Sequence, residues 1–338
     1  MKPPALRPGD AIGVVAPSWC GPATFPHRVE RGIRFLEGLG YRVVVGAHAC
    51  GRRGWVAGTP EERVADLHGF FADPDVRLIL SAIGGDHACQ LLPLLDWDLI
   101  RRHPTILLGY SDVTVLNLAV YAKTGLTTFN GPALMTDFGE SPEPYPYTVA
   151  AMLAAVARPE PIGELTPAPA WTDEFQAWET QADLTRPRAR RPSPGWSWLR
   201  GGKAAGLLVG GCLESMDHLR GTPCWPSFDG AVLFFETAEV ATTPERVDAL
   251  LQDYENMGVL SQIRALLVGR PYGYTDAQRA ELAAVLLERT RGHAFPIVAE
   301  LDFGHTAPQM TLPIGCRIEV DADARRLIIL DPAVTAKE

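Results

Sequence analysis

A serine that could act as a nucleophile lies in the stretch Gly109-Tyr110-Ser111-Asp112. It follows the short apolar run 105–108 and precedes a helix-like pattern that begins at Val113. A serine on a sharp turn between a buried strand and a helix presents its hydroxyl at the top of the sheet, beside the positive end of the helix. The alternative is that Ser111 and Asp112 only cap the helix, because both residue types are favoured there.

Backbone amides close to this turn could stabilise an oxyanion. The amide of Asp112 would point to the place where the oxyanion forms, and a second donor could come from the turn Gly84-Gly85, where the backbone can approach a ligand closely. The pattern departs from the hydrolase motif G-x-S-x-G, because Val113 stands where the second glycine would be.

A hydroxyl nucleophile needs a base, which is usually a histidine held by a carboxylate. Among eight histidines, His305 stands in the glycine- and proline-bearing loop 302–308, and His87, directly after Gly84-Gly85-Asp86, is its rival by position. Glu236 directly follows the apolar run AVLFF, where a buried charge requires a partner. Ser111, Glu236 and His305 are therefore a candidate triad, with Glu239 as an alternative carboxylate.

The first half of the chain alternates strand-like and helix-like patterns. Strands are expected at 11–16, 41–45, 76–83 and 105–108, and helices at 27–39 and 60–71, from Asp86 and from Val113. Near-continuous apolar strands in this rhythm predict a parallel sheet covered on both faces. Ligands bind beyond the carboxyl ends of such strands, which is where Gly84-Gly85 and Ser111 lie.

The pattern changes after about residue 158. Residues 159–203 are rich in proline and predict a crossover linker with a long loop. From residue 204 the strands look shorter and hairpin-like, with one convincing helix at 244–257 and two strands around the Asp-Ala-Asp-Ala turn at 321–324. We therefore expect an α/β protein with a Rossmann-like parallel-sheet domain at 1–158 and a smaller β-rich domain at 204–338.

Composition limits the partners. The net charge of -9 argues against binding of a nucleic acid polymer. No apolar run approaches the roughly 18 residues that cross a bilayer, and no signal-peptide pattern precedes the first strand, so a cytoplasmic location without a membrane partner is expected. The six scattered cysteines form no Cys-x-x-Cys pair, which predicts reduced, buried side chains rather than a disulfide or zinc framework.

Seven motifs together resemble a known family. They are VVAPS (14–18), AIGGDHACQLLPLLD (82–96), LLGYSDVTVLN (107–117), FNGPAL (129–134), GGCLESM (210–216), VLFFET (232–237) and FGHTAPQMTLPIG (303–315). In this order they are similar to the LD-carboxypeptidase family of serine peptidases, which includes the microcin C immunity peptidases. The resemblance spans nearly the whole chain.

The resemblance implies a catalytic triad of Ser111, Glu236 and His305, with the amides of Gly85 and Asp112 as oxyanion donors. It also implies a Rossmann-like domain followed by a smaller β-rich domain, and a homodimer. The chemistry is serine-type hydrolysis of an amide bond in a small peptide-like substrate, without a metal or another cofactor.

Two substrates are compatible with this family. One branch removes the terminal D-amino acid of murein tetrapeptide, and the other cleaves the amide between an amino acid and a nucleotide-like toxin. The long segment before Glu236 looks more like the second branch, in which a loop aromatic stacks on the nucleobase, and Trp171 and Trp178 are the candidates. The alternatives are that these tryptophans pack the domain junction, and that the chain is a non-catalytic peptide- or nucleotide-binding module. The arginines at 186–191 could meet a phosphate or a carboxylate, or only be solvated.

Overall fold

The first sheet is built from short apolar strands, which are buried on both faces except for the partly exposed edge strand β2. In this computed structural model, which describes residues 1–239 and 243–336, its strand order is β14-β5-β4-β3-β1-β2. The neighbours among β1 to β5 are parallel and β14 pairs antiparallel with β5. The strands are β1 (Ala11–Val15), β2 (Arg42–Val45), β3 (Val76–Ser81), β4 (Ile106–Gly109), β5 (Thr128–Asn130) and β14 (Leu312–Ile314). This is the predicted Rossmann-like parallel sheet, with one strand added from the second half of the chain.

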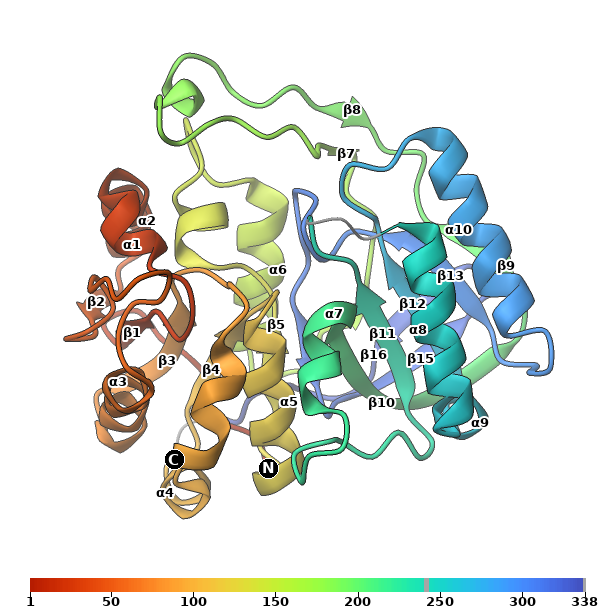
Figure 1. The fold of residues 1–338 in the computed structure, drawn as a ribbon, viewed down its shortest axis with the longest axis horizontal. Helices are drawn as coiled ribbons and strands as arrows, with labels where there is room; N and C mark the ends of the chain where they lie inside the picture. Colours follow the sequence, from red (N-terminus) through yellow and green to blue (C-terminus); the bar gives the residue numbers. More distant parts are fainter. Residues whose placement is uncertain (240–242, 337–338) are drawn as a thin grey trace.

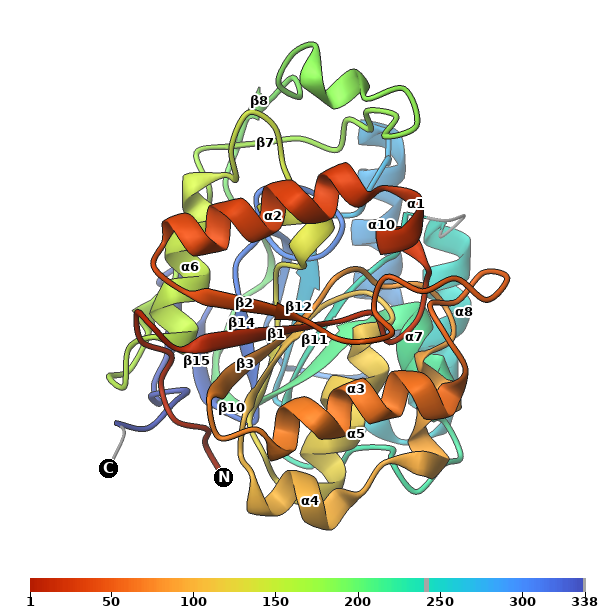
Figure 2. The same cartoon turned by 90° about the vertical axis from the view of Figure 1, so that its left-hand side faces the viewer.

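Helices cover both faces of this sheet, and Figure 2 shows α2 and α3 on opposite sides of β1 and β3. The helical segments are α1 (Gly21–Thr24), α2 (Pro26–Gly38), α3 (Pro60–Ala72), η1 (Ala88–Leu94), α4 (Trp97–Arg102), α5 (Val113–Thr124), η2 (Leu134–Phe138) and α6 (Pro146–Val156). Thr59 begins α3 as predicted: its hydroxyl accepts from the Glu62 amide at 3.2 Å, and the Glu62 carboxylate accepts from the Thr59 amide at 2.7 Å.

The second sheet has the order β6-β16-β15-β10-β11-β12-β13-β9 and lies beside the first (Figure 1). Its strands are β6 (Gly163–Glu164), β9 (Ser197–Arg200), β10 (Lys203–Cys212), β11 (Val232–Glu236), β12 (Ala265–Gly269), β13 (Ile297–Leu301), β15 (Arg317–Asp321) and β16 (Arg326–Ile329). The last two pair antiparallel around the predicted turn.

The hairpin-like connections expected for the other strands of this half were wrong. β10, β11, β12 and β13 are parallel neighbours, joined through α7 (Leu213–Met216), η4 (Asp217–Leu219), α8 (Pro244–Asn256), α9 (Val259–Gln262) and α10 (Asp276–Arg289). The expected helix corresponds to α8, whereas α10 was missed because it buries only Leu282 and Leu286. A capping box of Thr275 and Gln278 was the available signal for α10.

The middle of residues 159–203, the crossover loop, runs over the top of both sheets in Figure 1, and the ends of this loop supply β6 and β9 to the second sheet. This loop contains a two-stranded ribbon of β7 (Ala170–Trp171) and β8 (Arg191–Pro192), and the short helix η3 (Ala182–Leu184). Thr172 pairs with Ala307 in an isolated bridge, through backbone hydrogen bonds of 2.7 and 2.9 Å. The crossover loop therefore contacts the segment that carries His305.

The two halves share backbone and side-chain contacts besides β14. The hydroxyl of Thr114 in α5 accepts from the amide of Cys212 at the end of β10, at 2.9 Å. Near the termini, the amide of Ala5 donates to the carbonyl of Thr335 at 2.9 Å. All six cysteines have free thiols. Within 1–239 and 243–336, no helix has the length and apolar character needed to span a membrane.

Candidate active site

Ser111 lies on a strained turn between β4 and α5. Its φ is 60°, in the left-handed region that a side chain other than glycine seldom adopts, and such strain is typical of functional turns. The capping alternative is not met, because the Asp112 side chain makes no capping hydrogen bond to α5. Instead, its Oδ2 accepts from the amides of His87 and Ala88, at 2.8 Å each. Asp112 thus ties the nucleophile turn to the turn after β3.

The predicted trio meets at one point. Nε2 of His305 lies 3.1 Å from Oγ of Ser111, and Nδ1 of His305 lies 2.7 Å from Oε2 of Glu236. Glu236 is fully buried at the end of β11, and the His305 side chain is only 7% exposed. An ionised carboxylate can only accept hydrogen bonds, so Nδ1 donates to Glu236 and Nε2 is the ring nitrogen that faces Ser111.

The backbone around His305 leaves room for Glu236. Gly304 has a φ of 99°, and a Cβ added there would lie 2.6 Å from Oε2 of Glu236. Glycine is needed here on both counts, since other residues avoid this conformation and would collide with the carboxylate.

The turn Gly84-Gly85 packs directly against Ser111. A Cβ added to Gly84 would lie 2.8 Å from Oγ of Ser111 and 3.3 Å from the Asp112 amide nitrogen. Gly85 has a φ of 143°, and a Cβ there would lie 2.4 Å from Oγ of Ser18. Since no side chain fits, the backbone of this turn borders the space above Ser111, as an oxyanion site requires.

A fourth polar group competes for the histidine. Oε2 of Glu239 lies 2.8 Å from Nε2 of His305, the atom that also faces Ser111, and the Glu239 side chain is half-exposed. Burial lowers the pKa of His305, but the charges and hydrogen bonds of Glu236 and Glu239 outweigh it and raise this pKa well above its usual value. Burial raises the pKa of Glu239, but its contact with His305 brings it down to about 2.

His305 is therefore protonated as long as its Nε2 contacts Glu239. A protonated imidazole cannot take a proton from Ser111, so Glu239 must leave Nε2 before His305 acts as a base. Sequence reasoning considered Glu239 as an alternative partner of the histidine. The structure places it on the opposite ring nitrogen from Glu236.

His87, the rival histidine, does not approach Ser111 through its ring. Its ring packs against Trp55 with 5.9 Å between centroids, and its amide donates to Oγ of Ser18 and Oδ2 of Asp112. His87 therefore supports the turn through its backbone.

A cavity of about 720 Å³ opens over Ser111 and His305, lined by both halves of the chain and by the crossover loop. Trp178 lines it, with its ring edge-on to Phe25 at 5.5 Å and the guanidinium of Arg28 at 4.5 Å from the ring centroid. Other lining residues that sequence reasoning missed include Trp19, Phe25, Trp55, Gln176, Glu214 and Gln309. They come from distant segments, and no motif joins them.

Trp171 does not line this cavity. It is 5% exposed, and guanidinium groups lie 4.1, 4.7 and 4.6 Å from its ring centroid, from Arg191, Arg270 and Arg279 respectively. Trp171 is a packing residue of the crossover loop, which is the kind of role considered as the alternative to substrate binding for the tryptophans. Three of the loop arginines are paired: Arg186 with Glu174, Arg188 with Glu140 and Arg191 with Asp173.

Comparisons with known proteins agree with this arrangement. Family models of the LD-carboxypeptidase N-terminal and C-terminal domains match residues 12–131 and 205–320. The microcin C7 self-immunity protein MccF of Escherichia coli is 31% identical over 98% of this chain and 96% of its own length. A protein of Bacillus subtilis named as a probable murein peptide carboxypeptidase is 31% identical over 97% of this chain and 94% of its own.

The likeness extends to three dimensions. A structure of MccF in complex with aspartyl sulfamoyl adenosine superposes with a TM-score of 0.93 at 30% identity, over 99% of this chain and all of that one. The two family models include the segments that carry Ser111, Glu236 and His305. The chain belongs to the LD-carboxypeptidase family of serine peptidases, and it is a hydrolase of peptide or amide bonds.

Proposed function

We propose that the chain hydrolyses the amide between an amino acid and a nucleotide-like leaving group, with Ser111, His305 and Glu236 as catalytic triad. The contacts of 3.1 Å from Ser111 to His305 and 2.7 Å from His305 to Glu236 carry the proposal. The alternative of a non-catalytic binding module predicted that Ser111 and His305 lie apart.

The mechanism follows from these contacts. Ser111 attacks the scissile carbonyl while Nε2 of His305 takes its proton, and the amides of Gly85 and Asp112 stabilise the oxyanion. His305 then donates this proton to the leaving nitrogen, and water hydrolyses the acyl-enzyme by the reverse proton path. Glu236 orients the imidazole and stabilises its charged form.

Two acidic side chains favour an aminoacyl group with a free α-ammonium. Glu214 and Glu239 both line the cavity. Oε2 of Glu214 accepts from the amide of Ala238, the residue before Glu239, at 3.2 Å. An α-ammonium beside them would gain favourable charge interactions and could draw Glu239 away from His305. In a murein tetrapeptide the corresponding nitrogen belongs to an uncharged peptide bond.

The leaving-group side of the proposal rests on Trp178 and on the likeness to MccF. Trp178 on the crossover loop offers a ring in the cavity, and stacking on an aromatic ring stabilises a bound base by about 1–3 kcal/mol. MccF has been crystallised with aspartyl sulfamoyl adenosine. The alternative substrate is murein tetrapeptide, in keeping with the B. subtilis relative.

A paired assay tests the proposal. Purified protein is given an aminoacyl sulfamoyl-adenosine and a murein tetrapeptide, with Ser111→Ala as the blank. We expect hydrolysis of the aminoacyl compound, with loss of rate when its α-amine is acetylated. Cleavage of the tetrapeptide alone would overturn the choice of substrate.

We further propose that the enzyme works in the cytoplasm as a homodimer. The dimer is an expectation from the family resemblance, and the location is an expectation from the sequence. Light scattering after size exclusion should give twice the chain mass of 36.7 kDa, and cell fractionation should place the activity in the cytoplasm.

A further inference from the structure

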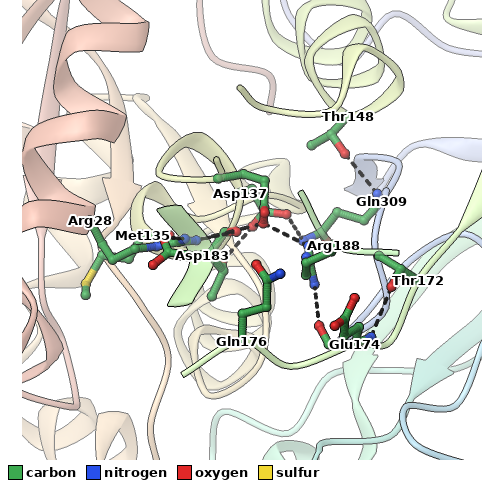
Figure 3. A network of polar contacts seen from close by, with 12 residues as sticks. Arg28, Met135, Asp137, Thr148, Thr172, Glu174, Gln176, Asp183, Arg188 and Gln309 are labelled. Atoms are coloured by element: carbon green, nitrogen blue, oxygen red, sulfur yellow. Dashed lines mark hydrogen bonds and ion pairs between the residues drawn. The ribbon is translucent and has the colours of Figure 1, made fainter. Parts of the chain in front are cut away.

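One part of the cavity wall is a network of buried charges from α2, the segment after η2 and the crossover loop (Figure 3). Nη1 of Arg28 lies 2.9 Å from Oδ2 of Asp183, and Nη2 of Arg188 lies 2.9 Å from Oε2 of Glu140. All four residues line the cavity. Because each guanidinium already faces a carboxylate, a phosphate would have to compete with that carboxylate. This wall is therefore poorly suited to an anion.

Gln309, four residues after His305, presents an unpaired acceptor in this wall. Its side chain is 1% exposed, and its Nε2 donates to Oδ1 of Asp137 at 2.9 Å. A carboxylate cannot donate, so this contact fixes which end of the amide is the oxygen. The oxygen, Oε1, is buried and has no hydrogen-bond partner among the described residues.

Gln176 on the crossover loop presents a second acceptor in the same way. It is 8% exposed, and its Nε2 donates to the carbonyl of Arg186 at 3.1 Å. A carbonyl also only accepts, so Oε1 of Gln176 is the free end, and it too is buried without a described partner. Both glutamines line the cavity, and Figure 3 shows them among the ion pairs.

Buried acceptors are seldom left unpaired, because each loses its hydrogen bonds to water. We infer that Gln176 and Gln309 form an acceptor subsite that binds N–H groups of the leaving group. The inference rests on the proposed function and identifies the leaving group more closely. Trp178 lines the same cavity two residues after Gln176, so the fitting ligand is a planar ring with an amino group, such as an amino-bearing nucleobase.

The subsite should discriminate by the amino group alone. A base without that group leaves both oxygens unpaired, whereas a base that carries it satisfies at least one. A site built to hydrogen-bond a substrate group rejects the analogue that lacks it, here by roughly tenfold to a hundredfold.

The test compares two ligands on one protein. Calorimetry measures binding of an aminoacyl sulfamoyl-adenosine and of its purine riboside counterpart, which lacks the 6-amino group, to the Ser111→Ala variant. We expect at least roughly tenfold tighter binding of the adenosine compound. Equal affinities, or no binding of either compound, would overturn the inference.

Variants connect the preference to the glutamines. In the Ser111→Ala background, Gln176→Met and Gln309→Met remove the amides with little change in volume, and each should reduce the preference. Gln262→Met is the control, since Gln262 is exposed and does not line the cavity. If Gln309→Met fails to fold because Asp137 loses a partner, Gln176→Met and the ligand pair still decide the matter. An unchanged preference in a folded Gln176→Met protein would remove Gln176 from the subsite.

Turnover separates this inference from the proposed function. If the parent chain hydrolyses both compounds with equal kcat/KM, the hydrolytic proposal stands and the subsite fails. If it hydrolyses neither but Ser111→Ala prefers the adenosine compound, the subsite stands and the hydrolytic proposal fails.

Discussion

The edge of the sheets that carries Ser111 and the crossover loop that faces it are held in different ways. Ser111 and Glu236 follow buried strands, and their positions depend on hydrogen-bonded sheet and on glycines that admit no side chain. The crossover loop joins the second sheet at its ends through β6 and β9. Its middle part is held by the ribbon of β7 and β8, by the bridge from Thr172 to Ala307, and by ion pairs such as Arg28–Asp183 and Arg188–Glu140. The groups proposed to act in catalysis thus depend on the sheets, and Trp178, proposed to bind the leaving group, lies on a loop in which ion pairs contribute much of the support.

Among changes at the sheet edge, Ser111→Ala should have the largest effect on turnover. It removes the attacking oxygen and should lower kcat by roughly 10⁵-fold or more. The loss should appear with every substrate that the chain accepts, measured by steady-state hydrolysis. An unchanged melting temperature serves as the control, and residual rates near those of the parent would exclude Ser111 as the nucleophile.

Glu236→Gln tests the support of the base at the same sheet edge. An amide at this position no longer stabilises the imidazolium and permits the wrong tautomer, so kcat should fall by roughly 10³- to 10⁴-fold. Circular dichroism should show an intact fold. Normal turnover would transfer the role of Glu236 to Glu239, which contacts the other ring nitrogen of His305.

Trp178→Ala tests whether the crossover loop contributes to substrate binding. Loss of stacking should reduce kcat/KM for an aminoacyl nucleotide by about 5- to 100-fold, mostly through KM. Trp171→Ala is its counterpart: this side chain is buried under three arginines, and its loss should destabilise the fold by about 3–5 kcal/mol. If Trp178→Ala lowered the melting temperature as much and left KM unchanged, Trp178 would be a packing residue as well.

Glu239→Gln should have the smallest effect, a shift in pH dependence. The negative charge of Glu239 helps to raise the pKa of His305, and the base must be neutral to act. Removing that charge lowers this pKa, so the acid limb of kcat/KM should move to lower pH. Glu179→Gln, another carboxylate that lines the cavity, is the control and should leave the limb in place. A limb that does not move would show that Glu239 does not hold His305 in solution.

The sheet edge is also the part of the site that could be predicted. Two apolar runs end at Gly84-Gly85 and at Ser111, and these ends indicate where the strands stop. In a parallel sheet the carboxyl ends of the strands lie at one edge. Glu236 was identifiable because a charge directly after a buried strand needs a partner. From the residues alone, Ser111, Glu236 and His305 were candidates beside His87 and Glu239, and the family resemblance singled the trio out.

The roles of the residues that face Ser111 from the crossover loop could not be predicted from the sequence in this way. Trp171 and Trp178 look alike in sequence, yet one is buried under arginines and the other lines the cavity, because contacts with distant residues decide between them. The same holds for Gln176 and Gln309, which lie far apart in the chain. The parallel pairing of β12 with β13 was missed for a related reason, because α10, which joins them, shows only a weak apolar pattern.

The strand β14 gives the chain a property of a different kind. His305 lies between β13, which belongs to the second sheet, and β14, whose Leu312 pairs with Asn130 of β5 in the first. The segment that carries His305 is thus hydrogen-bonded into a different sheet at each end. For protein engineering, the two halves therefore cannot be exchanged independently. A chimera joined within 159–203 would insert β14 of one parent into the first sheet of the other. Grafting 312–314 together with the N-terminal half is the remedy that this topology suggests.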